Sequence, residues 1–308
     1  MRDELVGKRA ASVEKARRLS AASAWMRANP MIVLGGILLV GLAFAGLLAP
    51  WLASQDPVAI DPAIRNKLPG FTHMVQLESG GEAEVTNWLG TDTLGRDILA
   101  RILYGIRISL VVGLSVSLAS VAIGLVIGLA SGYVRWLDGI VMRIMDGLMA
   151  IPPILLAMAI VTLFRPGLFS VILAITVPEI PRVVRLVRSV VLSAREQPYV
   201  QAAVSLGTRP HLIVLRHILP STVAPLIVLA TFICASAMLI EAVLSFIGIG
   251  IPPEIPTLGN IMADGRLLFR LYPGKIFFAA IVLALAVLAV NMLGDGLRDK
   301  IDHKARER

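Results

Sequence analysis

Three carboxylates interrupt otherwise apolar stretches of the sequence, and ionisable groups in such stretches are costly enough to suggest a function. They are Asp146, Glu179 and Glu241. Arg143 lies three residues before Asp146 and shares its helical face. Arg182 follows Glu179 at the same spacing. For Asp146 and Glu179 we therefore weigh a local ion pair against a role in gating or in a translocation pathway.

Glu241 differs from the other two because no basic residue lies three or four positions away. It lies toward the outer end of its apolar stretch and is followed by Ser245 and Phe246. We expect Glu241 to face the interior of a helix bundle and to help organise an outer gate. The candidates for the pathway or gate are Glu241, Ser245, Phe246, Glu179 and Asp146.

The sequence contains no recognisable catalytic motif. Around Lys275 it lacks the upstream glycine and the following Ser or Thr of a phosphate-binding loop. The only cysteine, Cys234, lies in an apolar stretch and can form no internal disulfide. The histidines are scattered, so we expect no metal, no cofactor and no reaction catalysed by this chain alone. They are His73, His211, His217 and His303.

The composition places the chain among integral membrane proteins. Of its 308 residues, 56% are hydrophobic and only 16% are charged, against about 25% charged residues in soluble domains. The mean hydropathy is +0.80. The net charge of +8 could suit nucleic acid, but the basic residues flank apolar stretches and aromatic residues are too few for base stacking. We therefore expect membrane lipid, and no nucleic acid, as a partner.

Six apolar stretches are long enough to cross a bilayer, which takes about 20 helical residues. They cover residues 31–52, 110–130, 141–163, 168–187, 222–247 and 276–297. Pro152 and Pro153 must break or kink the third stretch, and small residues in the second favour close helix contact. Basic residues gather near both termini and after the fourth stretch, so the positive-inside rule places both termini in the cytoplasm.

The polar segment 195–220 separates two of these stretches and has the pattern of two short helices. Gly207 marks the break between them, and Pro210 opens the second helix, where proline costs least. The second helix mixes apolar residues with arginine and histidine, so it is amphipathic and cannot cross a bilayer. We expect a docking surface parallel to the membrane. The alternative is a solvated basic loop.

Two segments precede the second apolar stretch on the outer side. Residues 55–90 are rich in Pro, Gly and acidic residues, and we expect a loop folded against the outer mouth rather than a separate domain. Residues 88–101 predict an amphipathic helix with Asp92 as its N-cap and with Asp97 and Arg101 on one face. This helix is expected to lie at the outer face of the membrane and to lead into the next span.

The polar segment resembles the cytoplasmic loop of ABC importer permeases. That family has Glu-Ala-Ala, then Gly, then a terminal Leu-Pro, and Gln201, Gly207 and Leu219 fall in register with it. Gln201 replaces the usual Glu, and His217 stands where Ile is common. The resemblance implies that the loop inserts into a groove on an ATPase subunit. The residues concerned are Gln201, Ala202, Ala203, Gly207, Thr208, Arg209, Pro210, His211, Leu219 and Pro220.

Two further segments resemble the permeases of dipeptide, oligopeptide and nickel importers. Residues 89–97 read Leu-Gly-Thr-Asp-Thr-Leu-Gly-Arg-Asp, which is similar to the signature of the second, C-type permease of such systems. Residues 241–250 resemble a further signature of the same permeases, whereas Glu179 departs from the family. The resemblance places Gly90, Thr91, Asp92, Gly95, Arg96 and Asp97 on the outer side that faces a binding protein.

The resemblance implies an all-α integral membrane protein with six transmembrane helices, cytoplasmic N and C termini and the ABC type I importer permease fold. The expected divisions are a cytoplasmic tail (1–29), a first transmembrane helix (30–52), an outer segment (53–107), a five-helix core (108–297) and a cytoplasmic tail (298–308). The implied location is the bacterial cytoplasmic membrane. The implied partners are a second homologous permease, two ATPase subunits that hold ATP and Mg, and an extracytoplasmic solute-binding protein.

The function expected from this resemblance is ATP-driven import of dipeptides or oligopeptides, with alternating access driven by the partner ATPases. Nickel chelates, opines and glutathione are alternatives within the family. Outside it, an ion-coupled secondary transporter would use the carboxylates in the spans, although no internal repeat is visible. A membrane scaffold without transport would not need kinked, glycine-containing spans.

Overall fold

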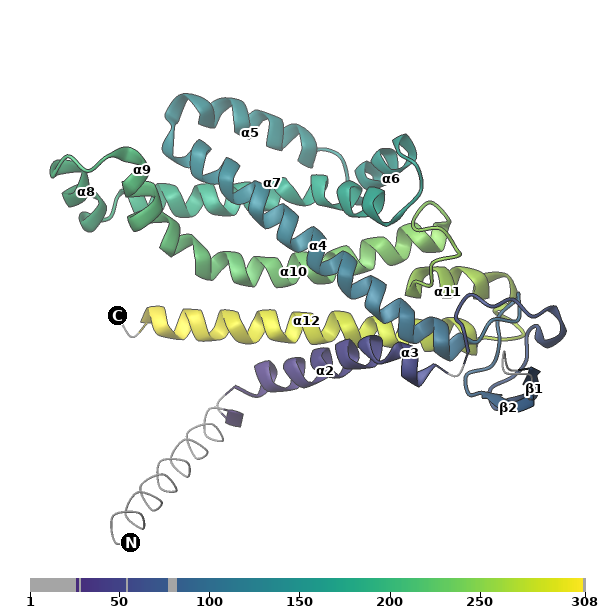
Figure 1. The fold of residues 1–308 in the computed structure, drawn as a ribbon. Coiled ribbons are helices and arrows are strands. Elements are labelled where there is room, and N and C mark those ends of the chain that lie inside the picture. The colour runs from purple at the N-terminus through teal and green to yellow at the C-terminus, as the bar shows by residue number, and fades with distance from the viewer. Residues whose placement is uncertain (1–25, 28, 54, 77–81, 307–308) are drawn as a thin grey trace, which may run out of the picture.

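The computed structural model describes residues 26–27, 29–53, 55–76 and 82–306. The predicted cytoplasmic tail over residues 1–29 lies almost entirely outside the described residues. Figure 1 shows long helices running side by side, with strands β1 (Phe71–Gln76) and β2 (Glu82–Asn87) at one end and α8 (Pro198–Ser205) at the other. These are called the outer and the inner end below.

Each predicted apolar stretch falls on a helix or on a helix pair. The helices are α2 (Pro30–Leu47) with α3 (Ala49–Leu52), α4 (Ile98–Tyr133), α5 (Arg135–Met149) with α6 (Pro153–Leu163), α7 (Leu168–Arg195), α10 (Leu219–Ile247) and α12 (Gly274–Arg306). Within the described residues four helices are long and apolar enough to cross a membrane, and α5 with α6 makes a fifth if the bent pair counts as one span. α7 is of similar length but contains charged residues from Glu179 onward.

The bend between α5 and α6 measures 90° and confirms the predicted break. Pro152 is the N-cap of α6 and Pro153 its first residue. Proline has no amide hydrogen, and its ring clashes with the preceding turn, so α5 cannot continue through the pair.

α4 and α7 approach one another closely along their inner halves. A Cβ atom added at Gly124, Gly128 or Gly132 would lie only 2.5–2.7 Å from the Cβ of a facing valine. The facing residues are Val183, Val187 and Val191. These six residues, called the Gly–Val ladder below, let the two backbones meet because the α4 side lacks side chains. Close contact through small residues of this span was predicted.

The outer end is more regular than the predicted loop. β1 and β2 form an antiparallel hairpin in which Phe71 faces Asn87. The hairpin is tied to the bundle, since Asn87 of β2 donates its Nδ2 to Asp97 Oδ1 at the start of α4 and Lys275 of α12 donates its Nζ to Asn66 Oδ1 just before the hairpin. The other outer elements are the 3-10 turns η1 (Pro62–Ile64) and η3 (Arg266–Leu268) and the helix α11 (Leu258–Gly265).

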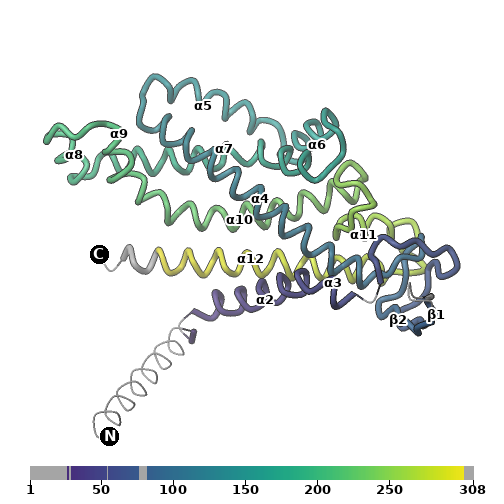
Figure 2. Tube along the Cα trace, in the orientation of Figure 1, coloured from purple at the N-terminus to yellow at the C-terminus, as the bar shows by residue number. Residues whose placement is uncertain are grey.

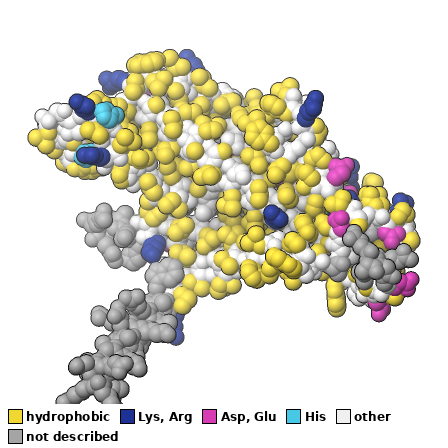
Figure 3. Space-filling view, in the orientation of Figure 1, with side chains coloured by type: hydrophobic (Ala, Val, Ile, Leu, Met, Phe, Trp, Pro, Cys, Tyr) yellow, Lys and Arg dark blue, Asp and Glu magenta, His cyan; other side chains and the backbone are white. Residues whose placement is uncertain are grey.

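The surface supports the predicted orientation. Figure 3 shows apolar side chains over the length of the helices, acidic side chains gathered at the hairpin end, and histidines with several basic side chains at the opposite end. A basic inner end and an acidic outer end agree with the positive-inside rule.

Candidate functional site

The inner end carries the predicted pair of short helices. α8 ends before Gly207, whose φ of +74° lies in the left-handed region that glycine adopts without cost. Helix α9 (Pro210–Ile213) follows, then a π-helical turn, η2 (Val214–Ile218). The π turn runs directly into α10, so the second short helix is not separate from the span that follows. The trace in Figure 2 shows α8 and α9 projecting beyond the inner end of the bundle.

One face of residues 195–220, called the docking segment below, is buried and the other is open. Val200, Ile213 and Ile218 pack into the hydrophobic core. The exposed face includes apolar side chains, of which Leu206 is 85% exposed. Of the residues predicted to contact an ATPase, Ala203 is buried and Thr208 and Leu219 are partly buried. The others are exposed: Gln201, Ala202, Gly207, Arg209, Pro210, His211 and Pro220.

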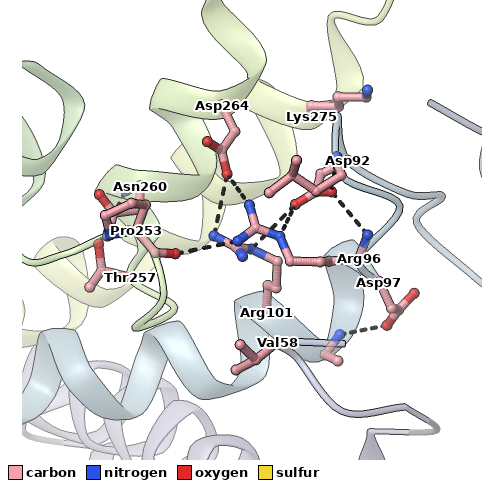
Figure 4. A network of polar contacts seen from close by, with 12 residues as sticks. Val58, Asp92, Arg96, Asp97, Arg101, Pro253, Thr257, Asn260, Asp264 and Lys275 are labelled. Atoms are coloured by element: carbon pink, nitrogen blue, oxygen red, sulfur yellow. Dashed lines mark hydrogen bonds and ion pairs between the residues drawn. The ribbon is translucent and has the colours of Figure 1, made fainter. Parts of the chain in front are cut away.

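At the outer end three buried charged residues and the partly buried Asp264 form a network that we call the outer clasp: Asp92, Arg96, Arg101 and Asp264 (Figure 4). The Nε atom of Arg96 donates to Asp92 Oδ2 at 2.6 Å, and its Nη2 donates to Asp264 Oδ2 at 2.7 Å. Arg101 Nη2 lies 3.3 Å from the same Asp264 oxygen, and Arg101 Nε lies 3.8 Å from Asp92 Oδ2. The clasp therefore ties the start of α4 to α11.

The clasp corrects the predicted helix over residues 88–101. Asp92 is not its N-cap, because α4 begins at Ile98 and Asp97 accepts the amide of Ala100. The second oxygen of Asp97 accepts from Asn87 Nδ2 at 3.0 Å, so Asp97 does not pair with Arg101. The charged face predicted at the membrane surface instead lies inside the protein, and the helix is the first part of α4 rather than a separate amphipathic element.

Burial shifts the pKa values of two aspartates at the outer end, Asp97 and Asp264. It raises the pKa of Asp97 above its ordinary value, and hydrogen bonds from Asn87 and from the Ala100 amide act in the opposite direction. Burial also raises the pKa of Asp264, whereas the charges of Arg101 and Arg96 lower it. Ionised Asp264 thus depends on the two arginines beside it.

The predicted binding-protein-side residues lie mostly inside the outer end. Thr91 donates its hydroxyl to Ile64 O and accepts from the Lys67 amide. A Cβ atom at Gly95 would lie 1.8 Å from Asp61 O, and one at Gly90 would also meet backbone. The predicted set is buried throughout: Gly90, Thr91, Asp92, Gly95, Arg96 and Asp97. These residues build the outer end and leave little side-chain surface for a docked protein.

Glu241 lies fully buried in α10, which agrees with the expected inward orientation. The hydroxyl of Ser245 donates to Glu241 Oε1 at 2.8 Å, and the same hydroxyl oxygen accepts the amide of Ile251 at 3.3 Å. Phe246 is partly exposed. Glu241 therefore acts through Ser245 on the connection between α10 and α11 (residues 248–257), called the outer connection below. It does not line an open surface of this chain.

Replacing Glu241 by alanine is expected to loosen the outer connection, because Ser245 loses its acceptor and no longer holds the Ile251 amide. Glu241→Gln keeps an acceptor oxygen and is expected to preserve the contact. Hydrogen exchange of the Ile251 amide measures the difference: faster in Glu241→Ala, near the unmodified rate in Glu241→Gln. Equal protection in both variants would exclude this role.

The other two carboxylates take different partners. Glu179 is buried and pairs with Arg182 at 3.2 Å, as the local alternative predicted, and accepts from Ser236 at 3.4 Å. Asp146 pairs with Arg185 of α7 at 2.5 Å and not with Arg143. The local alternative for Asp146, a pair with Arg143, was wrong because α5 lies against α7, which brings a residue 39 positions away within reach.

Sequence reasoning missed residues whose partners lie far along the chain. Asp264 and Asn260 bind the start of α4 and the loop after α10, and Arg188 binds Asp138 across α5 and α7. The contact from Arg96 to Asp264 joins positions 168 residues apart. Charge balance gave no clue to Asp264, since segment 88–101 carries two aspartates for its two arginines.

Comparisons with known families place most of the chain. Residues 120–307 match the family described as binding-protein-dependent transport system inner membrane component. Residues 22–69 match the N-terminal transmembrane domain of oligopeptide transport permease C.

Curated relatives match over most of their length. A probable peptide ABC transporter permease of Sinorhizobium fredii is 48% identical over 280 residues, which cover 91% of each chain. The dipeptide transport system permease of Alkalihalophilus pseudofirmus is 36% identical and the match covers 91% of this chain and 88% of the relative. A glutathione transport system permease of Pectobacterium atrosepticum is 40% identical over 71% of this chain and 73% of the relative.

Solved structures show the same fold. The inward-facing MetNI methionine ABC transporter has a TM-score of 0.53 at 22% identity, covering 63% of this chain and 93% of that chain. An amino acid ABC transporter with histidines has a TM-score of 0.52 at 15% identity, covering 63% and 91%. The expected ABC importer permease fold is thereby confirmed.

Proposed function

The chain belongs to the family of binding-protein-dependent transport system inner membrane components, and from this membership we propose that it is a permease subunit of an ATP-driven importer of dipeptides or oligopeptides. The observation that carries the proposal is the match to peptide and dipeptide permeases at 36–48% identity over about nine-tenths of the chain. The cytoplasmic membrane is the location that fits this family and the apolar helices.

The partners and cofactors follow from the proposal. A second permease completes the pathway, a solute-binding protein delivers the peptide, and two ATPase subunits hold ATP and Mg. The docking segment supports a partner at the inner end. Its Leu206 side chain is 85% exposed, and covering such an apolar side chain with another protein is energetically favourable. We assign the contact with the ATPases to residues 195–220.

Leu206→Asp is expected to weaken binding of the ATPase subunits at least tenfold, because it places a charge on the apolar part of the docking surface. The matched control is Leu267→Asp, since Leu267 is 87% exposed at the outer end. Co-purification of ATPases with each variant, at equal permease yield, is the measurement. Equal recovery with both variants would remove residues 195–220 from the contact.

ATP-dependent uptake tests the proposed function itself. The tagged chain is purified from native membranes with its partners, identified by mass spectrometry and reconstituted in vesicles with labelled dialanine as the probe. Uptake that requires ATP and the binding protein supports the importer. Uptake driven by a proton gradient without ATP would favour an ion-coupled secondary transporter, for which Glu179 and Glu241 were the candidate carboxylates.

A further inference from the structure

A cavity of about 970 Å³ opens at the outer end between the α6–α7 turn, the connection after α10, and α11. Its volume lies in the range of small-molecule sites, roughly 300–1,000 Å³. Apolar walls come from Phe164 and Ile249, and charged groups come from Glu254, Asp264 and Arg266. Some of its lining residues take part in the contacts described above, but none of those contacts assigns a function to the cavity itself.

The wall formed by residues 248–255 is held in place before any ligand arrives. Asn260 Nδ2 lies within 3.0–3.2 Å of the carbonyl oxygens of Ile251, Pro252 and Ile255. The Ser245 hydroxyl accepts the amide of Ile251. A wall already fixed by these contacts costs little ordering entropy when a ligand binds.

The outer clasp also contacts this wall, through Arg96. Arg96 Nη1 lies 3.4 Å from Pro253 O, while its Nη2 binds Asp264. The two clasp arginines therefore neutralise the Asp264 carboxylate through its Oδ2 atom. This leaves Glu254 as the lining carboxylate without a charged partner among the described residues. Glu254 is exposed on the cavity side of the loop.

Arg266 supplies the opposite charge. It is exposed, and its Nη1 donates to Phe246 O at 3.2 Å, which fixes the side chain while the remaining guanidinium nitrogens keep donors for a ligand. One cavity thus combines a carboxylate, a guanidinium and apolar walls.

We infer that this cavity is a binding site for a short zwitterionic peptide, with Glu254 binding the ammonium group, Arg266 the carboxylate, and the apolar walls the side chains. The inference rests on the proposed function and adds to it a site on this chain that takes peptide released by the binding protein before it enters the membrane. A guanidinium binds a carboxylate through paired, charge-assisted hydrogen bonds, and this selects free peptide termini.

Charge reversal in the reconstituted importer tests the inference, with labelled dialanine as the probe and with saturating binding protein. Arg266→Glu is expected to lower uptake about tenfold while ATP hydrolysis stimulated by the binding protein is retained, because the change removes a contact with the peptide in the cavity and leaves the docking segment at the inner end unaltered. Glu254→Arg is expected to do the same. The double variant Glu254→Arg, Arg266→Glu is expected to recover uptake, since a peptide can bind in the reverse direction.

Matched controls are Arg65→Glu and Glu84→Arg, which reverse exposed charges at the outer end away from the cavity lining. Uptake near the unmodified rate is expected for both. If Arg266→Glu and Glu254→Arg transport dialanine at the unmodified rate, or if the double variant is as impaired as the singles, the cavity is not a peptide site. Absence of ATP-dependent uptake in the unmodified importer would instead overturn the proposed function.

Discussion

Asp264→Ala is expected to disorganise the outer end of the protein and to abolish recovery of a folded chain. The carboxylate neutralises Arg96 and Arg101, whose side chains are almost completely buried. Breaking a buried ion pair by removing one partner costs about 3–5 kcal/mol, because the remaining charge stays buried without compensation. Here one change leaves two arginines with Asp92 as their shared partner. The measurement is the fraction of detergent-extracted chain that elutes as a single monodisperse species.

Two variants define what the Asp264 result means. Glu84→Ala removes an exposed carboxylate from the hairpin and is expected to leave elution unchanged. Asp264→Asn keeps the shape but loses the charge, and it is expected to fall between the alanine variant and the unmodified chain. Full monodispersity of Asp264→Ala would show that the clasp does not stabilise the fold.

Gly128→Val is the second change with a large expected effect, because it places a branched side chain where two helices touch. A Cβ at this position already lies 2.6 Å from Val187 Cβ, so α4 and α7 must separate. Overpacking of this kind costs about 1–3 kcal/mol, and here the separation also breaks neighbouring contacts of the Gly–Val ladder. Loss of thermal stability in mild detergent is the measurement.

An exchange of the two residues tests the explanation. The double variant Gly128→Val, Val187→Gly moves the side chain to the other helix and is expected to recover much of the lost stability. Gly41→Val is the control, because nothing lies within 4 Å of a Cβ at Gly41. A double variant that is less stable than Gly128→Val alone would argue against direct contact as the cause.

The helices were predictable because their signals are local. Apolar length gave each long helix, Pro152-Pro153 gave the bend, and Gly207 with Pro210 gave the break and restart at the inner end. The hairpin was missed because two strands of six residues, one of them acidic, carry too little apolar alternation to distinguish them from a loop.

The contacts at the candidate sites were less predictable, because they depend on how the helices pack. The local ion pair weighed for Glu179 is present, with Arg182 three residues away on the same helix. Asp146 was given the neighbour on its own helix, whereas packing of α5 on α7 supplies Arg185. Segment 88–101 looked amphipathic because its charges were counted as exposed, and burial beside Asp264 reverses that reading.

The helix that begins in the docking segment has a mechanical consequence. Residues 210–247 form one helix of 38 residues, about 57 Å long at 1.5 Å per residue. It carries part of the exposed docking segment at its inner end and the Glu241–Ser245 contact at its outer end. Its two ends are therefore mechanically coupled across the membrane, and a tilt of the helix at one end displaces the other end. The π turn before Leu219 and the proline at position 225 are the points at which this helix can bend.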